Sequence, residues 1–418
     1  MFKKSSLALL IAGAMGVTSQ NIYADGVPGG SMQNNPAFNV VMEGRYVDQD
    51  ADHFSLPGFQ AHDSFDHLGV FENGFSAGHN EINMGGTVTE DTSGVISFAV
   101  ENHDGESSVD LEEAYVETTA LGNGVTAKVG QFYSHIGLLN TKHEHRQDFA
   151  NASLVYIGMF GGHLSNTGVQ LRYEQAGDIG FSAGVEVSTG ADYPGGHSED
   201  NNGGLTLFAK VTGDIGSKSS WSAGVSSFSS DFDARHTGGH HAAGPEEFEL
   251  ENGSVKVTGV DLEYVFSPNG KGETGELKIS MEYYMRDEDG EAMFTDAAGD
   301  IASADYDGEQ SGYYVAAVYT FMPQWRVGLR FDHLESDNSF SNFDGDVDAN
   351  ATSILLADFE AESRLISDRE PERTTLMVDY APNHNTTIRA QFMKDDVGAE
   401  TEDRVYLQYI VAIGGHGH

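Results

Sequence analysis

Sixteen short stretches in which apolar and polar residues alternate run through the chain, and the connections between them alternate between short and long. Each stretch is close to the ~10 residues that a tilted strand needs to cross the hydrocarbon layer of a membrane. The predicted strands are residues 37–47, 76–89, 93–103, 109–119, 124–133, 166–176, 180–188, 203–213, 219–229, 254–266, 274–287, 310–322, 324–335, 372–380, 385–394 and 403–413.

The connections constrain the fold more than the strands do. Tight turns such as residues 90–92 follow every second stretch, and long loops follow most of the others. Short periplasmic turns and long extracellular loops on an even number of strands are typical of transmembrane β-barrels. We therefore predict an all-β fold, a transmembrane antiparallel β-barrel of about 16 strands, with about 18 as an alternative because three stretches alternate imperfectly. The predicted long loops include residues 134–165, 230–253, 288–309 and 336–371.

The two faces of the predicted strands differ in polarity. Residues 403–413 carry an unbroken apolar stripe from Val405 to Ile413, and in residues 324–332 Leu329 opposes Arg330. A soluble barrel turns its apolar face inward, whereas a membrane barrel turns it towards lipid, and alternation alone does not distinguish the two. Strand length, loop pattern and the start of the chain favour the membrane.

The first residues have the features of an export signal. Two lysines precede an apolar segment from Leu7 to Val17, and Ala24 ends a suitable cleavage site. We therefore expect a signal peptide over residues 1–24 and a single outer-membrane β-barrel over residues 25–418 in a Gram-negative bacterium. No later stretch approaches 18 consecutive apolar residues, so no transmembrane helix is predicted for the mature chain.

The charge of the chain excludes one class of partner. There are 65 Asp and Glu against 22 Lys and Arg, a formal net charge of −43, so a phosphate backbone is repelled and nucleic-acid binding is not expected. The chain has no cysteine and therefore neither a disulfide nor a thiolate metal site. The expected partners are outer-membrane lipid and small solutes or ions.

Two functional motifs are imitated without the context that they require. G-x-S-x-G strings surround Ser76 and Ser182, but each opens a predicted strand, whereas a nucleophile elbow joins a strand to a helix. Asp344, Asp346 and Asp348 begin like a calcium loop, yet Leu355 stands where such a loop has glutamate, which leaves at most a loose surface cation site. We predict that the chain is not an enzyme.

The loop over residues 134–165 follows the fifth predicted strand, where barrels of this size often fold a loop inward to narrow the pore. Five ionisable residues lie close together in it and form the predicted constriction: His143, Glu144, His145, Arg146 and Asp148. A basic wall facing acidic loops would create a transverse field that orients polar solutes. The cations that alternation places on this inward pore wall are Arg45, Lys128, Arg172, Lys210, Lys278, Arg326, Arg330 and Arg389.

Histidines are unusually frequent on the outer side of the predicted barrel, where 14 of the 17 fall. Imidazole is a good ligand for zinc, copper and nickel, and nearby carboxylates could complete the shell. The alternative is that these are ordinary polar loop residues on an acidic surface. The predicted function requires no cofactor. The metal ion that the histidine-rich loops would bind is Zn²⁺ or another divalent cation. The predicted metal ligands are His143, His145, His236, His240 and His241.

Short motifs resemble one known family. The run Val129-Gly130-Gln131-Phe132-Tyr133 leads into Gly137-Leu138-Leu139-Asn140. The start of the predicted barrel carries Asn35-Pro36-Ala37, and a Gly-His-rich end follows Tyr406-Leu407-Gln408-Tyr409. These features are similar to outer-membrane porin-like proteins described as zinc-regulated outer-membrane receptors, and more distantly to the phosphate-selective porins. The resemblance implies a sixteen-stranded barrel, a homotrimer and a link with zinc supply. The excess of acidic residues departs from the basic path of a phosphate pore.

Together these features predict an outer-membrane porin for passive diffusion of small hydrophilic solutes or ions, linked to the uptake of zinc or another divalent metal. The alternative is a metal-binding outer-membrane receptor. Bilayer conductance with and without Zn²⁺ separates the two hypotheses.

Overall fold

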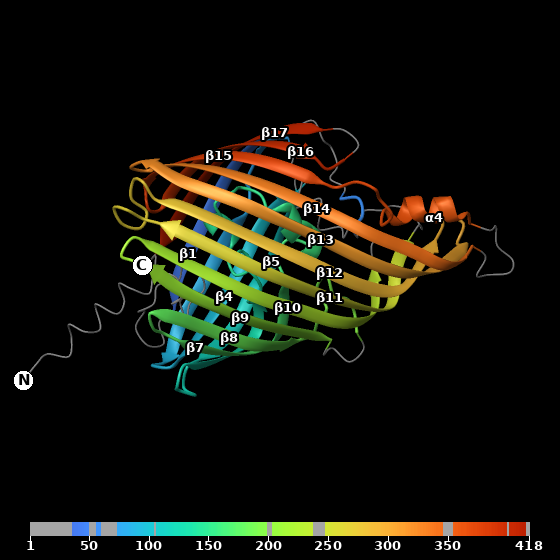
Figure 1. Cartoon of the computed structure of the whole chain (residues 1–418), viewed down its shortest axis with the longest axis horizontal. Coiled ribbons are helices and arrows are strands. Elements are labelled where there is room, and N and C mark those ends of the chain that lie inside the picture. Colours follow the sequence, from blue (N-terminus) through green and yellow to red (C-terminus); the bar gives the residue numbers. More distant parts are fainter. Residues whose placement is uncertain are drawn as a thin grey trace, which may run out of the picture.

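The computed structural model describes residues 36–49, 56–59, 73–103, 106–198, 203–236, 247–345, 354–398 and 401–414. These residues form one antiparallel sheet that closes on itself, because β1 (Ala37–Gln49) also pairs with β17 (Glu402–Gly414) (Figure 1). β2 (Gly74–Ser76) and β3 (Asn80–Thr89) both pair with β1 and act as one interrupted strand. The seventeen strands found in the described residues therefore make a barrel of sixteen.

The predicted number of strands is confirmed as sixteen, and every predicted stretch coincides with a strand of the barrel. The expected signal peptide over residues 1–24 lies outside the described residues. The remaining strands are β4 (Thr92–His103), β5 (Glu106–Thr118), β6 (Val125–Tyr133), β7 (Ser165–Gln175), β8 (Ile179–Ser188), β9 (Gly204–Ile215), β10 (Ser219–His236), β11 (Glu247–Phe266), β12 (Leu277–Thr295), β13 (Ile301–Met322), β14 (Trp325–Asp344), β15 (Glu372–Asn383) and β16 (Thr386–Asp396).

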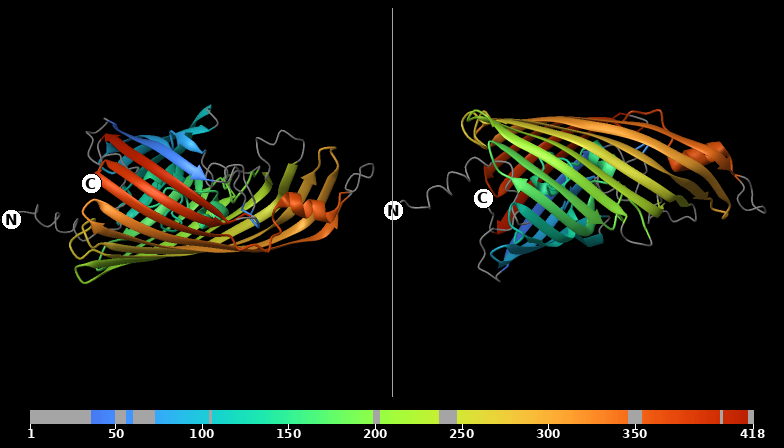
Figure 2. Two further views of the ribbon diagram at one scale, coloured as in Figure 1. Left: turned by 90° about the horizontal axis from the view of Figure 1, so that it is seen from above. Right: turned by 60° about the horizontal axis from the view of Figure 1, so that its bottom comes forward.

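The predicted loops 230–253, 288–309 and 336–371 are wrong in extent, because β10 to β14 continue far into them. Beyond the membrane the outward face need not be apolar, so the alternation of hydrophobicity stops while the hydrogen-bonded ladder goes on. In β12, for example, Asp287, Asp289 and Glu291 point outward into solvent, yet all three remain paired with both neighbouring strands. The extended strands form a tall wall on one side of the barrel, with α4 (Leu356–Ser363) near its far end (Figure 1, Figure 2).

The polarity of the barrel is that of a membrane protein. On β17 the side chains of Leu407 and Tyr409 are 48% and 52% exposed on the outer face, whereas Arg404 and Gln408 are buried on the inner face. On β14 Leu329 is exposed and its neighbour Arg330 is buried. This apolar-out and polar-in arrangement fits strands that contact lipid on one side and a polar lumen on the other, and it excludes the soluble alternative.

Helices are few and short among the described residues. The connection from β6 to β7 contains the 3₁₀ turn η1 (Glu144–Arg146) and the helix α3 (Leu154–Phe160). All seven residues of α3 are buried, and they share one apolar cluster with Tyr284 of β12 and Leu334 of β14. No helix in the described part of the chain is both long and apolar enough to span a membrane.

The outward apolar face gives a test of the barrel's orientation. Leu329 lies four residues after Trp325, the first residue of β14, and therefore about 10 Å along the membrane normal, which is near the middle of the hydrocarbon layer. Leu329→Arg should lower the free energy of unfolding in lipid vesicles by about 2–4 kcal/mol. Ile215→Arg, at the turn end of β9, is the matched control and should cost about 0–1 kcal/mol. Equal effects at both positions would contradict this orientation.

Candidate functional site

The segment between β6 and β7, residues 134–164, crosses the interior of the barrel, and we call it the inner segment. The Leu154 amide donates to Asp332 on β14 at 3.0 Å, and the Gly158 carbonyl accepts from Arg286 on β12 at 2.8 Å. The Ala150 amide donates to Gln391 on β16 at 3.0 Å. The inner segment is thus bound to strands on the side of the closed sheet opposite to those that it connects.

A buried carboxylate fixes the start of the inner segment. Glu282 of β12 accepts hydrogen bonds from the Leu138 amide at 2.9 Å and from the hydroxyls of Tyr156, Tyr284 and Tyr314 at 2.7–2.9 Å. Gly137 next to it has φ +67°, and a Cβ there would collide with Glu282 and Tyr284. A buried charge is tolerated when several donors surround it, so this group holds the inner segment against the wall.

All eight predicted wall cations lie on the inner side of the barrel, and each is paired with a carboxylate. The pairs are Arg45 with Glu43, Lys128 with Glu117, Arg172 with Glu174, Lys210 with Asp261, Lys278 with Asp148, Arg326 with Asp148 and Asp379, Arg330 with Asp332, and Arg389 with Asp379. Among these partners only Asp148 belongs to the inner segment. The expected field between a basic wall and acidic loops is therefore replaced mainly by ion pairs along the wall itself.

The five predicted constriction residues do not act as one group. Asp148 bridges Lys278 at 2.5 Å and Arg326 at 3.0 Å, while Arg146 is exposed. The other three, His143, Glu144 and His145, lie against β3, β5 and the link between β2 and β3, where the His145 imidazole is 2.7 Å from Glu81.

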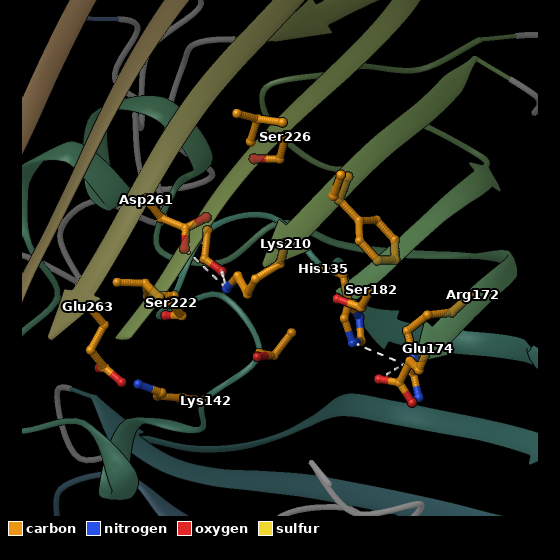
Figure 3. Close-up of a pocket in the computed structure, with 16 residues that line it drawn as sticks. His135, Lys142, Arg172, Glu174, Ser182, Lys210, Ser222, Ser226, Asp261 and Glu263 are labelled. Atoms are coloured by element: carbon orange, nitrogen blue, oxygen red, sulfur yellow. Dashed lines mark hydrogen bonds and ion pairs between the residues drawn. The ribbon is translucent and has the colours of Figure 1, made fainter. Parts of the chain in front are cut away.

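A pocket in the lumen lies on the opposite side of the inner segment, against β7 to β11, and has a volume of about 100 Å³ (Figure 3). Of the predicted site residues only Arg172 and Lys210 line it. Sequence analysis did not single out its other ionisable residues as site residues: His135, Lys142, Glu174, Asp261 and Glu263. The inward alternation of β7 and β11 could have identified the three acids, whereas the turn that brings His135 and Lys142 towards them has no sequence signal.

Charges of both signs face this pocket. The Lys210 ammonium lies 3.2 Å from Asp261 and donates to the Gly137 carbonyl at 3.0 Å, which links the wall to the inner segment. Arg172 pairs with Glu174 at 3.2 Å and lies 3.2 Å from the His135 ring (Figure 3). Burial, together with the neighbouring cations Arg172, Lys128 and Lys210, holds the pKa of His135 well below its usual value. The pocket therefore presents fixed charges and a neutral imidazole at neutral pH.

The predicted metal ligands fall into two sets. His143 and His145 both lie beside Glu81, and ligand atoms of His79, Glu81 and Glu112 lie within 4.8 Å of one another. The backbone of His236 is in β10, while its side chain, His240 and His241 lie outside the described residues. Sequence reasoning counted His79 among the histidines of the outer side, within the predicted strand 76–89; the structure places it between β2 and β3 and buries it.

A β-bulge in β5 explains why sequence analysis did not place Glu112 and Glu113 in the lumen. The ladder between β4 and β5 shifts register between Ser97 and Phe98, so Glu112 and Glu113, which are consecutive in sequence, both turn inward. Strict alternation would have placed one of them in lipid, and two adjacent acids in a predicted spanning strand are the signal that such a bulge leaves.

The pH dependence of the inner segment follows from its histidines. Burial lowers the pKa of His163 to about 4, from an ordinary value of 6.5, and its ring stacks on Tyr133. Between pH 6.5 and 4 the His163 ring is protonated when the inner segment is unfolded and neutral when it is folded. The free energy that keeps the inner segment folded therefore falls as the pH falls. Although burial lowers the pKa of His143, the carboxylates of Glu81, Glu112 and Glu113 raise it well above 6.5, so its contribution is constant in this window.

Hydrogen exchange measures this effect. After correction for intrinsic rates, protection of residues 134–164 should fall by up to about thirtyfold from pH 6.5 to pH 4.5, which corresponds to about 2 kcal/mol. His163→Phe keeps the ring and should reduce that fall, although His135 still contributes in the same direction. His333→Phe, on β14 outside the inner segment, is the control. An unchanged pH dependence in His163→Phe would show that His163 is not the group that titrates.

Comparison with known proteins agrees with this geometry. A protein-family model described as "Putative beta-barrel porin-2, OmpL-like" matches residues 29–407. An uncharacterized protein of Aquifex aeolicus (strain VF5) is 27% identical over 240 residues, 54% of this chain and 48% of that protein. The chain thus spans about half the length of this curated relative.

Solved structures share the fold at low sequence identity. Outer-membrane expressed OmpT of Vibrio cholerae has a TM-score of 0.51 at 12% identity over 92% of this chain and 100% of that chain. The outer membrane channel DcaP of Acinetobacter baumannii has a TM-score of 0.50 at 14% identity, with 92% and 100% covered. The anion-selective porin of Comamonas acidovorans has a TM-score of 0.50 at 11% identity, with 91% and 99% covered.

The narrower resemblance to zinc-regulated receptors stays a prediction, since these comparisons concern the porin fold. Because the family model covers most of the sequence and the closed barrel turns its apolar face outward, the chain belongs to the OmpL-like beta-barrel porin-2 family and is a porin-like protein of the Gram-negative outer membrane.

Proposed function

We propose that the chain is a passive diffusion pore for small hydrophilic solutes and ions. The observation that carries the proposal is the pocket between the inner segment and β7 to β11, lined by ionised side chains inside a barrel with an apolar outer face. Fixed charges of both signs replace part of the hydration of a polar solute and disfavour an apolar one. The expectation that the chain is not an enzyme stays a prediction, supported by its family and by the position of Ser76 and Ser182 within strands.

The path is proposed to run on the β7 to β11 side of the lumen. On the other side α3 is fully buried, and Arg286, Asp332 and Gln391 hold the backbone of the inner segment. From the first part of the inner segment, His135, Gly137, Leu138, Thr141 and Lys142 line the pocket. A solute would therefore pass between the first part of the inner segment and the wall.

Conductance tests both the pore and its path. Purified protein in planar bilayers should give ohmic current steps, and a folded but silent barrel would refute the pore. Ser182 faces the pocket from β8, and its neighbour Ala183 points to the opposite face. Ser182→Trp should lower the single-channel conductance by about twofold or more because it narrows the passage, whereas Ala183→Trp should leave it unchanged. If both substitutions act alike, the path lies elsewhere.

The acids of β11 give a test of selectivity. Asp261 and Glu263 line the pocket. Without these two negative charges, the positive charges of Lys210, Lys142 and Arg172 are less neutralised, and the pocket becomes more positive. Asp261→Asn with Glu263→Gln should shift the reversal potential in a KCl gradient towards anions. The expected change in permeability ratio is about fivefold, from a charge interaction of about 1 kcal/mol at 4 Å in water. Asp178→Asn with Asp214→Asn, in or beside exposed turns, removes the same charge and should leave the ratio unchanged.

Two finer proposals accompany the pore. A metal-binding receptor is the second candidate, favoured by His79, His143 and His145, which share carboxylate neighbours on β3 and β5. A homotrimer is proposed because OmpT of Vibrio cholerae is described in a trimer form, and light scattering of the detergent-solubilised protein tests it.

A further inference from the structure

We propose that His79, Glu81, Glu112 and His143 form a binding site for a zinc-like divalent cation, which joins the inner segment to the lumen wall. His79 precedes β3, Glu81 lies on β3, Glu112 lies in the bulge of β5, and His143 comes from the inner segment. Ligand atoms of the first three lie within 4.8 Å of one another. His143 is the fourth proposed ligand, because its Nδ1 lies 3.3 Å from Oε2 of Glu81 and 3.3 Å from Oε2 of Glu112, on the other side of the same two carboxylates.

The first argument is that two buried imidazole nitrogens point at the same carboxylates without a hydrogen bond. His79 is 8% exposed and His143 is 1% exposed. His79 Nε2 lies 3.4 Å from Glu81 Oε1 and 3.3 Å from Glu112 Oε1. Neither His79 Nε2 nor His143 Nδ1 makes a hydrogen bond. A buried polar atom without a hydrogen bond is costly, so two of them facing the same pair of carboxylates point to a ligand bound there.

The second argument is the spacing of the donor atoms. A tetrahedral zinc ion holds nitrogen and oxygen ligands at about 2.0–2.2 Å, which sets neighbouring ligand atoms about 3.3–3.5 Å apart. His79 Nε2 lies at this spacing, 3.3–3.4 Å, from Oε1 of both carboxylates, and His143 Nδ1 lies 3.3 Å from their other oxygens, Oε2. To hold one ion, each carboxylate would turn a single oxygen towards both imidazoles. Imidazole ligands favour Zn²⁺ and similar transition ions over Ca²⁺ and Mg²⁺, which prefer oxygen-only shells.

The third argument is the outer hydrogen bond of each imidazole. His79 Nδ1 is 2.7 Å from Glu101, and His143 Nε2 is 3.2 Å from Glu113. A ring that donates a proton to a carboxylate through one nitrogen can give up the proton on its other nitrogen to a metal ion, and metal-bound histidines usually have such a partner. The remaining nitrogens are the two that face Glu81 and Glu112.

Further contacts orient the two central carboxylates. The Tyr133 hydroxyl donates to Glu112 at 2.8 Å, and Ser97 donates to it at 3.1 Å. Asn83 donates to Glu81 at 3.3 Å, while His145 lies 2.7 Å from that carboxylate. His145 is therefore a neighbour of the site, placed to orient Glu81.

Calorimetry with Zn²⁺ on the folded mature chain in detergent at pH 7.5 tests the site. The wild type should bind one Zn²⁺ ion that excess Ca²⁺ or Mg²⁺ does not displace. His79→Ala with His143→Ala should weaken this binding by more than about 100-fold. His240→Ala with His241→Ala is the matched control, which removes the same number of histidines outside the proposed ligand set and should leave the affinity unchanged.

A milder variant covers the case in which the double substitution prevents folding. Glu101→Gln leaves all four proposed ligands in place and should weaken Zn²⁺ binding by about 10–100-fold, because the ring of His79 loses its carboxylate partner. Circular dichroism and heat-modifiable gel migration verify the barrel in each variant.

Three results would overturn the site: a wild type without saturable Zn²⁺ binding, unchanged affinity in the folded variants at this cluster, or loss of binding only in the His240 and His241 control. Binding is measured without a membrane current. The pore and the metal site can therefore fail independently.

Discussion

The closure of the sheet between its first and last strands is the constraint on which everything else depends. In a lipid layer no water can satisfy an unpaired amide or carbonyl, so an open edge in the hydrocarbon would cost several kcal/mol for each group. The ladder from Asn39 opposite Gly414 to Gln49 opposite Arg404 removes that edge. Once the sheet is closed, each spanning strand must present one face to lipid and the other to the lumen, which fixes where every charge can go.

The consequence is a lumen crowded with charges that satisfy one another. Arg286, Arg330 and Arg373 are among the largest fully buried side chains, which is unusual for a soluble core. Each is beside a carboxylate, at 3.5, 2.8 and 2.6 Å respectively. The inner segment uses the same chemistry, since its backbone groups are held by wall side chains. The lumen is therefore organised by polar contacts, while its one large apolar cluster gathers around α3.

The sequence predicts the membrane-spanning strands, whose outward residues face lipid, but few of the contacts between side chains inside the barrel. Alternation identified every spanning strand, because outward residues such as Leu407 must be apolar whatever lies inside. It failed in the upper part of β12, where outward residues such as Asp289 face water and the pattern no longer differs from a loop. It also failed at the β5 bulge, where one extra residue turns both Glu112 and Glu113 inward. Contacts such as Leu154 with Asp332 join positions 178 residues apart and have no local signal.

The tall wall changes how molecules can reach the mouth of the barrel. β11 to β14 contain 19–22 residues, so at about 3.3 Å per residue each is about 60–70 Å long, roughly twice what the bilayer requires. Among the described strands, this additional length is found on one side of the barrel. A molecule that approaches from the side of β11 to β14 therefore meets this wall before it reaches the lumen, whereas the other described strands end closer to the membrane.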